Sequence, residues 1–251
     1  MQYKVNPKSD GSGIVCAIPQ KGRCPNNCDH CFFQGHGRSY LKPIEENTPN
    51  MPTVEQTMGR VVRVNDGNDS NYYPYLVKDS VRYYPHKFFN TSIPKNLEFF
   101  EDPVVLTINP AEMTDKEFYR LNPIPKNLMF VRIRTNMWNM DKVVRPAVKY
   151  YTKLEVPVVL TFMAYYDTDD KVPEEIPKEF LDCYVFRKRT LNSYYAITTF
   201  AWELIMREFR YNHWLYSCSK IEGEKGTYKC HRCGNCLREY FYTMEKIRNG
   251  S

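Results

Sequence analysis

The chain has 251 residues, of which 42% are hydrophobic and 15% aromatic, and a formal net charge of +6. This length and composition predict a globular protein with one large core and exclude a disordered chain. The charge is mild for the length and does not by itself indicate nucleic-acid binding.

The sequence also bears on the cellular compartment. No apolar run reaches the length of a membrane span, and residues 1–8 contain no apolar signal segment. We therefore expect a cytoplasmic protein that does not associate with membranes. In that reducing compartment, metal binding or catalysis explains the nine cysteines better than disulfides do.

Six short β-rich segments, each bounded by polar, Gly or Pro residues, are predicted strands. They span residues 13–18, 60–65, 86–92, 103–108, 128–134 and 157–163. Helices are predicted over 114–121 and 140–153. A longer helix is predicted over 193–214, with an apolar stripe of Ile197, Phe200, Ala201, Leu204 and Ile205. Strands that alternate with helices favour βα units around a parallel sheet.

Three cysteines in the pattern C-x3-C-x2-C follow the first predicted strand: Cys24, Cys28 and Cys31. Three thiolates can hold three irons of a [4Fe–4S] cube and leave the fourth iron open to a small molecule. A structural zinc site needs four ligands, and no fourth cysteine lies near. The spacing therefore favours a cluster with an open iron over the alternatives, a zinc knuckle or a disulfide loop.

A second group of cysteines lies near the end of the chain: Cys218, Cys230, Cys233 and Cys236. Four thiolates can close a metal site completely, around either a [4Fe–4S] cluster or a tetrahedral zinc ion. We favour a second [4Fe–4S] cluster, with zinc as the alternative.

The triplet, its place after the first strand and the six βα units together resemble the radical S-adenosylmethionine (SAM) superfamily. The resemblance implies a partial (β/α)6 TIM-like barrel over 1–216 and a Cys-rich extension over 217–251, similar to auxiliary-cluster extensions. It also implies that the open iron binds SAM. An electron from a donor such as flavodoxin or ferredoxin then splits SAM into methionine and a 5′-deoxyadenosyl radical. That radical would take a hydrogen atom from an unidentified substrate, a peptide or a small molecule.

The same resemblance implies which residues contact SAM, because the chemistry of such barrels gathers at the carboxyl ends of the strands. The family's Gly-Gly-Glu motif is absent after the second strand, where residues 67–70 take its place. The candidate SAM contacts, in the Cys loop and at the strand ends, are His30, Phe32, Asn68, Asp69, Ser70, Asn90, Ser92, Glu112 and Arg134.

Alternation along the fifth strand separates two kinds of side chain. Val131 and Ile133 share one face, and Arg132 and Arg134 share the other. Helices should cover the apolar outer face, so the arginines are expected to point into the barrel. Buried arginines need an anion, such as a SAM or substrate carboxylate, a phosphate or Glu112. A purely structural ion pair is the alternative.

A second function class is a zinc-stabilised module that binds nucleic acid or protein without catalysis. It would leave the first site one ligand short unless His30 or His36 completes it. It also offers no reason for six strands with polar ends.

Overall fold

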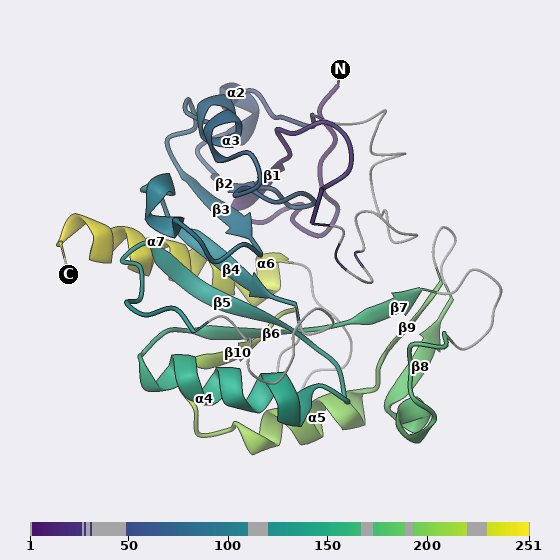
Figure 1. Ribbon diagram of the computed structural model, residues 1–251. Coiled ribbons are helices and arrows are strands. Elements are labelled where there is room, and N and C mark those ends of the chain that lie inside the picture. The colour runs from purple at the N-terminus through teal and green to yellow at the C-terminus, as the bar shows by residue number, and fades with distance from the viewer. Residues whose placement is uncertain are drawn as a thin grey trace.

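The computed structural model describes residues 2–26, 28, 31, 49–109, 120–166, 173–188, 193–219 and 230–250. Seven parallel strands form one curled sheet, a half-barrel, in the order β1-β2-β3-β4-β5-β6-β10 (Figure 1). These strands are β1 (Ile14–Ala17), β2 (Val61–Val64), β3 (Lys87–Thr91), β4 (Val104–Ile108), β5 (Leu128–Thr135), β6 (Val158–Phe162) and β10 (Leu215–Ser217).

The six predicted strands are confirmed, each end within one residue of its predicted position. Their β-branched and apolar residues are buried on both faces, as in Val104–Ile108. A parallel sheet with both faces covered requires such continuous apolar runs, which is why the sequence indicated them clearly.

The predicted helix over 193–214 is wrong at both ends. Its first residues form β9 (Tyr194–Ile197), its middle forms α5 (Thr199–Glu208), and it ends six residues early, before β10 begins at Leu215. Thr198 is the N-cap of α5, since its side chain accepts a 3.2 Å hydrogen bond from the backbone N–H of Ala201. β10 is a seventh strand that the sequence did not indicate, because three residues are too few to show a period.

The predicted apolar stripe of this helix is also partly wrong. Phe200 and Leu204 are 71% and 48% exposed, whereas Ala201, Trp202 and Ile205 are buried. The buried side of α5 therefore includes Trp202, which the prediction left out. Its indole N–H donates a 2.9 Å hydrogen bond to the hydroxyl of Ser217 in β10.

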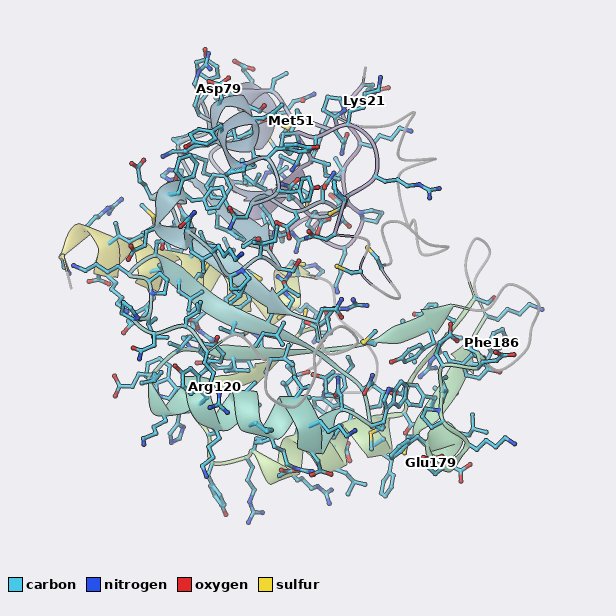
Figure 2. All side chains as sticks on the ribbon, viewed as in Figure 1. Lys21, Met51, Asp79, Arg120, Glu179 and Phe186 are labelled. Carbon is cyan, nitrogen blue, oxygen red and sulfur yellow. The ribbon has the colours of Figure 1, made fainter. Side chains whose placement is uncertain are left out.

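A small antiparallel sheet begins one residue after β6 and was not predicted. It contains β7 (Ala164–Tyr166), β8 (Tyr184–Arg187) and β9 in the order β7-β9-β8, with the 3-10 helix η4 (Lys178–Cys183) before β8. Phe186 and Glu179 mark its position in Figure 2. Trp138 packs on Tyr165 and Tyr184 and so joins this sheet to the end of β5.

The other helices are α2 (Val54–Thr57), α3 (Pro74–Ser80), η1 (Leu97–Phe100), η3 (Met140–Val144), α4 (Arg145–Lys153), α6 (Cys230–Cys233) and α7 (Asn235–Arg248). The predicted helix over 140–153 is confirmed as a π-helical turn, η3, followed by α4. The predicted helix over 114–121 lies outside the described residues apart from its last two, which are not helical. No described helix has the length and apolar character needed to cross a membrane.

The two faces of the sheet have different coverings. α4 and α5 lie on one side, the outer face, and α7 lies on the other, the inner face (Figure 1). Tyr240 of α7 packs in an apolar cluster that takes one residue or more from each of the first six strands: Ile14, Val61, Phe88, Val105, Met129, Phe130 and Val159. The division of the chain at residue 217 stays a prediction.

Candidate functional site

The Cys triplet follows β1 at the carboxyl edge of the sheet. Cys24 is buried, and Cys28 and Cys31 are partly buried. The backbone N–H of Cys31 donates a 3.2 Å hydrogen bond to the carbonyl of Cys28, so the backbones of these two residues lie close together. His30 and Phe32 lie outside the described residues.

Asp69, just after β2, connects the Cys loop to the neighbouring strand ends. It is 4% exposed. One carboxylate oxygen accepts hydrogen bonds from the Asn26 side chain at 2.7 Å and from the backbone and hydroxyl of Ser92 at 2.7 and 2.9 Å. The other accepts from the Thr91 hydroxyl at 2.7 Å and the Asn71 backbone at 2.9 Å. Asp69 therefore holds three segments together, and Ser92 and Asn26 lie beside it.

The other predicted residues after β2 and β3 also have partners within the protein. Ser70 is fully buried and accepts a 3.0 Å hydrogen bond from Asn65. Asn90 donates to the Val64 carbonyl at 3.0 Å and accepts from Arg132 at 3.3 Å. Asn68 accepts a 3.0 Å hydrogen bond from the backbone N–H of Asp69. These contacts order the edge of the sheet around the Cys loop.

Arg132 and Arg134 lie on the inner face, as predicted from alternation. The register pairs Thr107 with Arg132, and Phe130 of the same face packs in the inner apolar cluster. Arg134 donates a 2.9 Å hydrogen bond to the side chain of Asn109, which follows β4. Glu112, the predicted alternative partner, lies outside the described residues.

A set of buried polar atoms at the same edge has no hydrogen-bond partner among the described residues. Its members belong to Gln20, Asn65, Asn109 and Thr161, at the ends of β1, β2, β4 and β6. An unpartnered buried polar atom costs about 1–3 kcal/mol, so a polar ligand at this edge would stabilise the protein. Gln20, Asn65 and Thr161 were not singled out from the sequence, although polar residues at strand ends are the signal that would have found them.

Burial also controls the triplet's chemistry. It raises the pKa of the Cys24 thiol to about 11, and hydrogen bonds from the backbone of Asn26 and Asp69 oppose this only in part. The thiol is therefore protonated near neutral pH without a metal, and a bound cation would displace its proton. The Cys31 charge raises the pKa of Cys24 in the same direction.

The C-terminal cysteines are not confined to one edge of the sheet. Cys218 continues β10, and its backbone N–H donates a 2.8 Å hydrogen bond to the Leu160 carbonyl. The N–H of Cys230 donates to the Lys8 carbonyl at 3.0 Å, which ties α6 to the N-terminal segment. Cys236, in the first turn of α7, packs with Cys218 against the inner apolar cluster. Cys233, at the end of α6, is partly buried.

Burial raises the pKa values of these thiols, and nearby positive charges lower them. Burial raises the pKa of Cys236 to about 11, although Arg132 and Arg63 oppose it. At Cys218 the nearby Lys8 and Arg132 outweigh burial, and the pKa falls to about 7. Among the described residues, no three Cys, His, Asp or Glu side chains are gathered at metal-binding distance.

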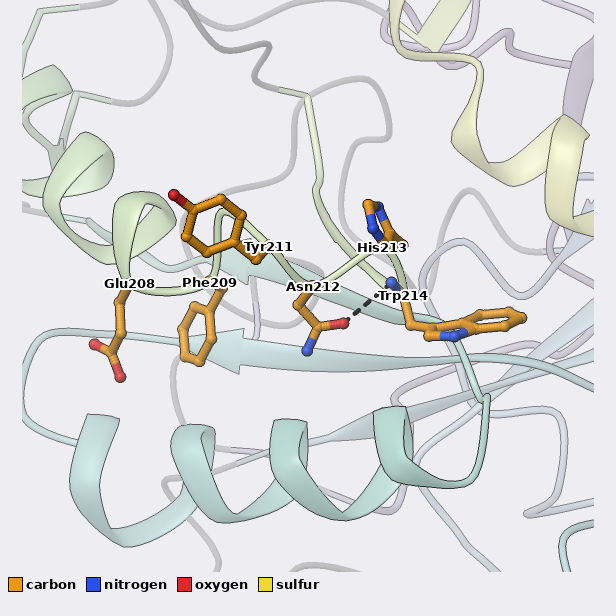
Figure 3. Close-up of a pocket in the computed structure, with 6 residues that line it drawn as sticks. All are labelled: Glu208, Phe209, Tyr211, Asn212, His213 and Trp214. Atoms are coloured by element: carbon orange, nitrogen blue, oxygen red, sulfur yellow. Dashed lines mark hydrogen bonds between the residues drawn. The ribbon is translucent and has the colours of Figure 1, made fainter.

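A shallow hollow of about 390 Å³ lies elsewhere, between the end of α5 and the start of β10 (Figure 3). Its lining includes Phe209, Tyr211, His213 and Trp214. Trp214 precedes β10, so the hollow lies at the amino edge of the sheet, opposite the Cys triplet. It has no part in the candidate site.

Comparisons of the chain with protein-family models, with curated proteins and with solved structures found no match. The site is therefore defined by its own geometry. It is a three-thiol loop at the carboxyl edge of a parallel half-barrel, beside buried polar atoms that lack partners among the described residues.

Proposed function

We propose that the protein is a radical SAM enzyme built on a partial (β/α)6 barrel. The observation that carries this proposal is the place of Cys24, Cys28 and Cys31, directly after β1 at the carboxyl edge of a curled parallel sheet. Functional groups of parallel barrels gather at this edge. The Asp69 hydrogen bonds support the proposal, because they fix the Cys loop against β2 and β3.

The chemistry of the donor set supports an iron–sulfur cluster with an open iron, because three thiols within eight residues can each ligate one iron. In the described residues these thiols are not gathered at metal-binding distance, so the proposal requires cluster binding to draw them together. When bound, such a cluster supplies the electron that cleaves SAM and so starts hydrogen abstraction from the substrate. The protein's own residues hold the cluster, orient SAM and exclude water.

The unpartnered polar atoms at the sheet edge fit SAM, which carries an ammonium, a carboxylate and ribose hydroxyls. The Asn65 and Gln20 carbonyl oxygens can accept hydrogen bonds, and the Asn109 amide can donate one. In this proposal Arg134, Asn90 and Ser92 line the same site. Asp69 has a positioning role, since it already accepts five hydrogen bonds.

Anaerobic reconstitution with iron and sulfide tests the proposal. We expect the intact chain to produce 5′-deoxyadenosine from SAM in the presence of dithionite. The variant with Cys24, Cys28 and Cys31 all changed to Ala should lose this activity and about four irons, the content of one cube. Cys183→Ala is the matched control, because Cys183 is a partly buried thiol of η4 outside both Cys groups.

The outcomes separate the two function classes. SAM cleavage by the triple variant would overturn the proposal. Zinc in both Cys groups, with no iron after reconstitution, would instead favour the zinc-stabilised binding module. The electron donor and the substrate stay predictions, and genes encoded beside this one would narrow the choice of substrate.

A further inference from the structure

The small antiparallel sheet has a free edge at β8. Among the described residues β8 pairs with β9 alone, whereas β7, at the opposite edge, begins one residue after β6 of the main sheet. Figure 1 shows the small sheet projecting from the main sheet beyond β6. A free edge presents backbone donors and acceptors with which another strand can pair.

The register of β8 on β9 shows which backbone groups face outward. The N–H of Thr198 donates a 2.8 Å hydrogen bond to the carbonyl of Cys183, so these two residues form a hydrogen-bonded pair. Such pairs alternate along an antiparallel ladder, so Val185 and Arg187 bond to β9 and the N–H and C=O of Phe186 point away from it. In the described part of the chain, neither backbone group of Phe186 has a partner.

Aromatic side chains form one face of this sheet. The ring centre of Phe186 lies 5.2 Å from that of Tyr195 on β9. Tyr184, two residues before Phe186 and so on the same face, packs on Trp138 with ring centres 5.9 Å apart. A strand added beside β8 would extend this face with its own alternate side chains, which makes apolar residues at every second position favourable.

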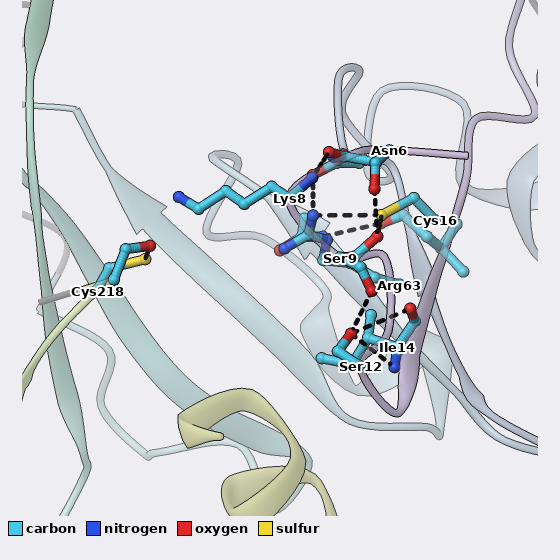
Figure 4. A network of polar contacts seen from close by, with 12 residues as sticks. Asn6, Lys8, Ser9, Ser12, Ile14, Cys16, Arg63 and Cys218 are labelled. Carbon is cyan, nitrogen blue, oxygen red and sulfur yellow. Dashed lines mark hydrogen bonds and ion pairs between the residues drawn. The ribbon is translucent and has the colours of Figure 1, made fainter. Parts of the chain in front are cut away.

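The carboxyl end of β8 carries positive charge. Arg63 of the main sheet has a carboxylate partner, since it lies 2.5 Å from an Asp66 oxygen and 3.2 Å from the Cys16 sulfur (Figure 4). Arg187 and Lys188 are exposed and form no ion pair with any described residue. The acidic residues of η4 precede β8, so its positive charge is confined to one end. Charges of one sign disfavour pairing with an identical edge and favour an acidic strand.

We propose that β8 binds an extended peptide segment as a fourth, antiparallel strand, with acidic residues at the amino end of the peptide beside Arg187 and Lys188. The antiparallel direction continues that of the sheet and places the amino end of the peptide at the carboxyl end of β8. Hydrogen bonds to the backbone of Phe186 supply affinity, and the charges and the aromatic face supply selectivity, as in other strand additions.

The position of the small sheet connects this edge to the candidate site. β7 follows β6 at the carboxyl edge of the half-barrel, and Trp138 joins the sheet to the end of β5. A peptide on β8 would therefore be held near the edge that carries the Cys triplet. Its identification as the substrate rests on the proposed function, whereas the binding itself does not.

Peptide binding to the full chain without SAM tests the proposal, measured by fluorescence anisotropy. The probe is a fluorescein-labelled peptide of three glutamates followed by alternating valine and threonine. We expect it to bind at least about fivefold more tightly at low salt than the peptide with the reverse order of residues. Lysines in place of the glutamates should abolish binding. Equal affinity for any two of these peptides, or no binding of the probe at about 1 mM, would overturn the proposal.

A proline at Phe186 tests the strand pairing. Phe186→Pro removes the outward N–H and keeps the hydrogen bonds between β8 and β9, because an edge strand tolerates proline where its N–H faces outward. We expect it to weaken binding by about tenfold or more. Phe186→Leu keeps the N–H and an apolar side chain, and its affinity should stay within about threefold of the parent. Equal affinity of the two variants, each shown by circular dichroism to be folded, would contradict strand addition.

Reversal of the two charges gives a test that leaves the strand intact. Arg187→Glu/Lys188→Glu should weaken binding by about tenfold at low salt and by less at high salt. Lys142→Glu/Lys149→Glu, exposed on η3 and α4, changes the net charge equally and is the matched control. Equal losses in the two double variants would overturn the proposal.

Sedimentation identifies a competing occupant, a second copy of this chain. A dimer that excludes the peptide and that Phe186→Pro dissociates would replace the peptide as the occupant of β8 and so overturn the proposal. SAM plays no part in these experiments, so their failure is distinct from failure of the proposed function.

Discussion

Asp69 shows how one side chain orders the candidate site. Its two oxygens accept hydrogen bonds from Asn26 in the Cys loop, from Asn71 on its own loop, and from Thr91 and Ser92 at the end of β3. Hydrogen bonds to a buried charged group each contribute about 1.5–3 kcal/mol. A change that turns one acceptor into a donor would therefore separate the segments that Asp69 joins.

We predict that Asp69→Asn lowers the free energy of unfolding of the metal-free protein by about 2 kcal/mol or more. The reason is that an amide group would face the Ser92 N–H and the Asn26 amide without accepting from both. Urea denaturation measures the change. Asp79→Asn on α3 is the control, since the Asp79–Arg82 ion pair is exposed and should contribute less than about 1 kcal/mol. Equal effects of the two substitutions would contradict the role assigned to Asp69.

At the scale of elements, α7 approaches β1 closely at Gly13. A Cβ atom on Gly13 would lie 2.7 Å from a terminal carbon of Leu237. Gly13→Ala should therefore displace the flexible end of the partly buried Leu237 side chain and cost about 1 kcal/mol of stability, the low end of the range for overpacked cores. The double variant Gly13→Ala/Leu237→Ala should be more stable than the sum of the two single effects predicts. Additive effects in urea denaturation would show that α7 does not lie against β1 in solution.

Tyr240 tests the packing of α7 on the inner face. It is 1% exposed, and its ring centre lies 6.4 Å from that of Phe88 on β3. Tyr240→Ala should destabilise the protein by about 3–5 kcal/mol, the usual cost of removing a buried aromatic ring. Tyr240→Phe keeps the ring, and we expect its unfolding free energy to stay within about 1.5 kcal/mol of the parent. If thermal and urea unfolding do not separate the two variants, the inner face is not a packed core.

At the scale of the whole molecule, the two Cys groups come from separate segments of the chain: the triplet follows β1, whereas Cys218 follows β10 and the other three belong to α6 and α7. Because the two groups share no residue, each should bind its metal without the other. We predict that Cys230→Ala/Cys233→Ala keeps about four irons, held by the triplet, if both sites form [4Fe–4S] clusters. Iron and acid-labile sulfide analysis measures this. Loss of all iron from that variant would show that the two sites depend on each other.

Local pattern determined six strands of the main sheet. Apolar, β-branched runs such as Val104–Ile108 indicated both the strands and their burial, because the pleat and the hydrophobic effect act over a few adjacent residues. Alternation alone also placed Arg132 and Arg134 on the face opposite Val131 and Ile133. The Cys spacing singled out two groups of thiols, because metal ligands on one loop or helix lie only a few residues apart.

Contacts between distant residues decided the rest. β10 pairs with β6 across more than 50 residues, and α7 lies on the inner face against β1 and β3. Arg63 of β2 and Arg132 of β5 share no motif with Cys236, yet alternation puts both arginines on the inner face, where Cys236 packs against the apolar cluster. No sequence period relates residues so far apart. Their proximity follows only from strand order and from the burial of α7, which are properties of the tertiary structure.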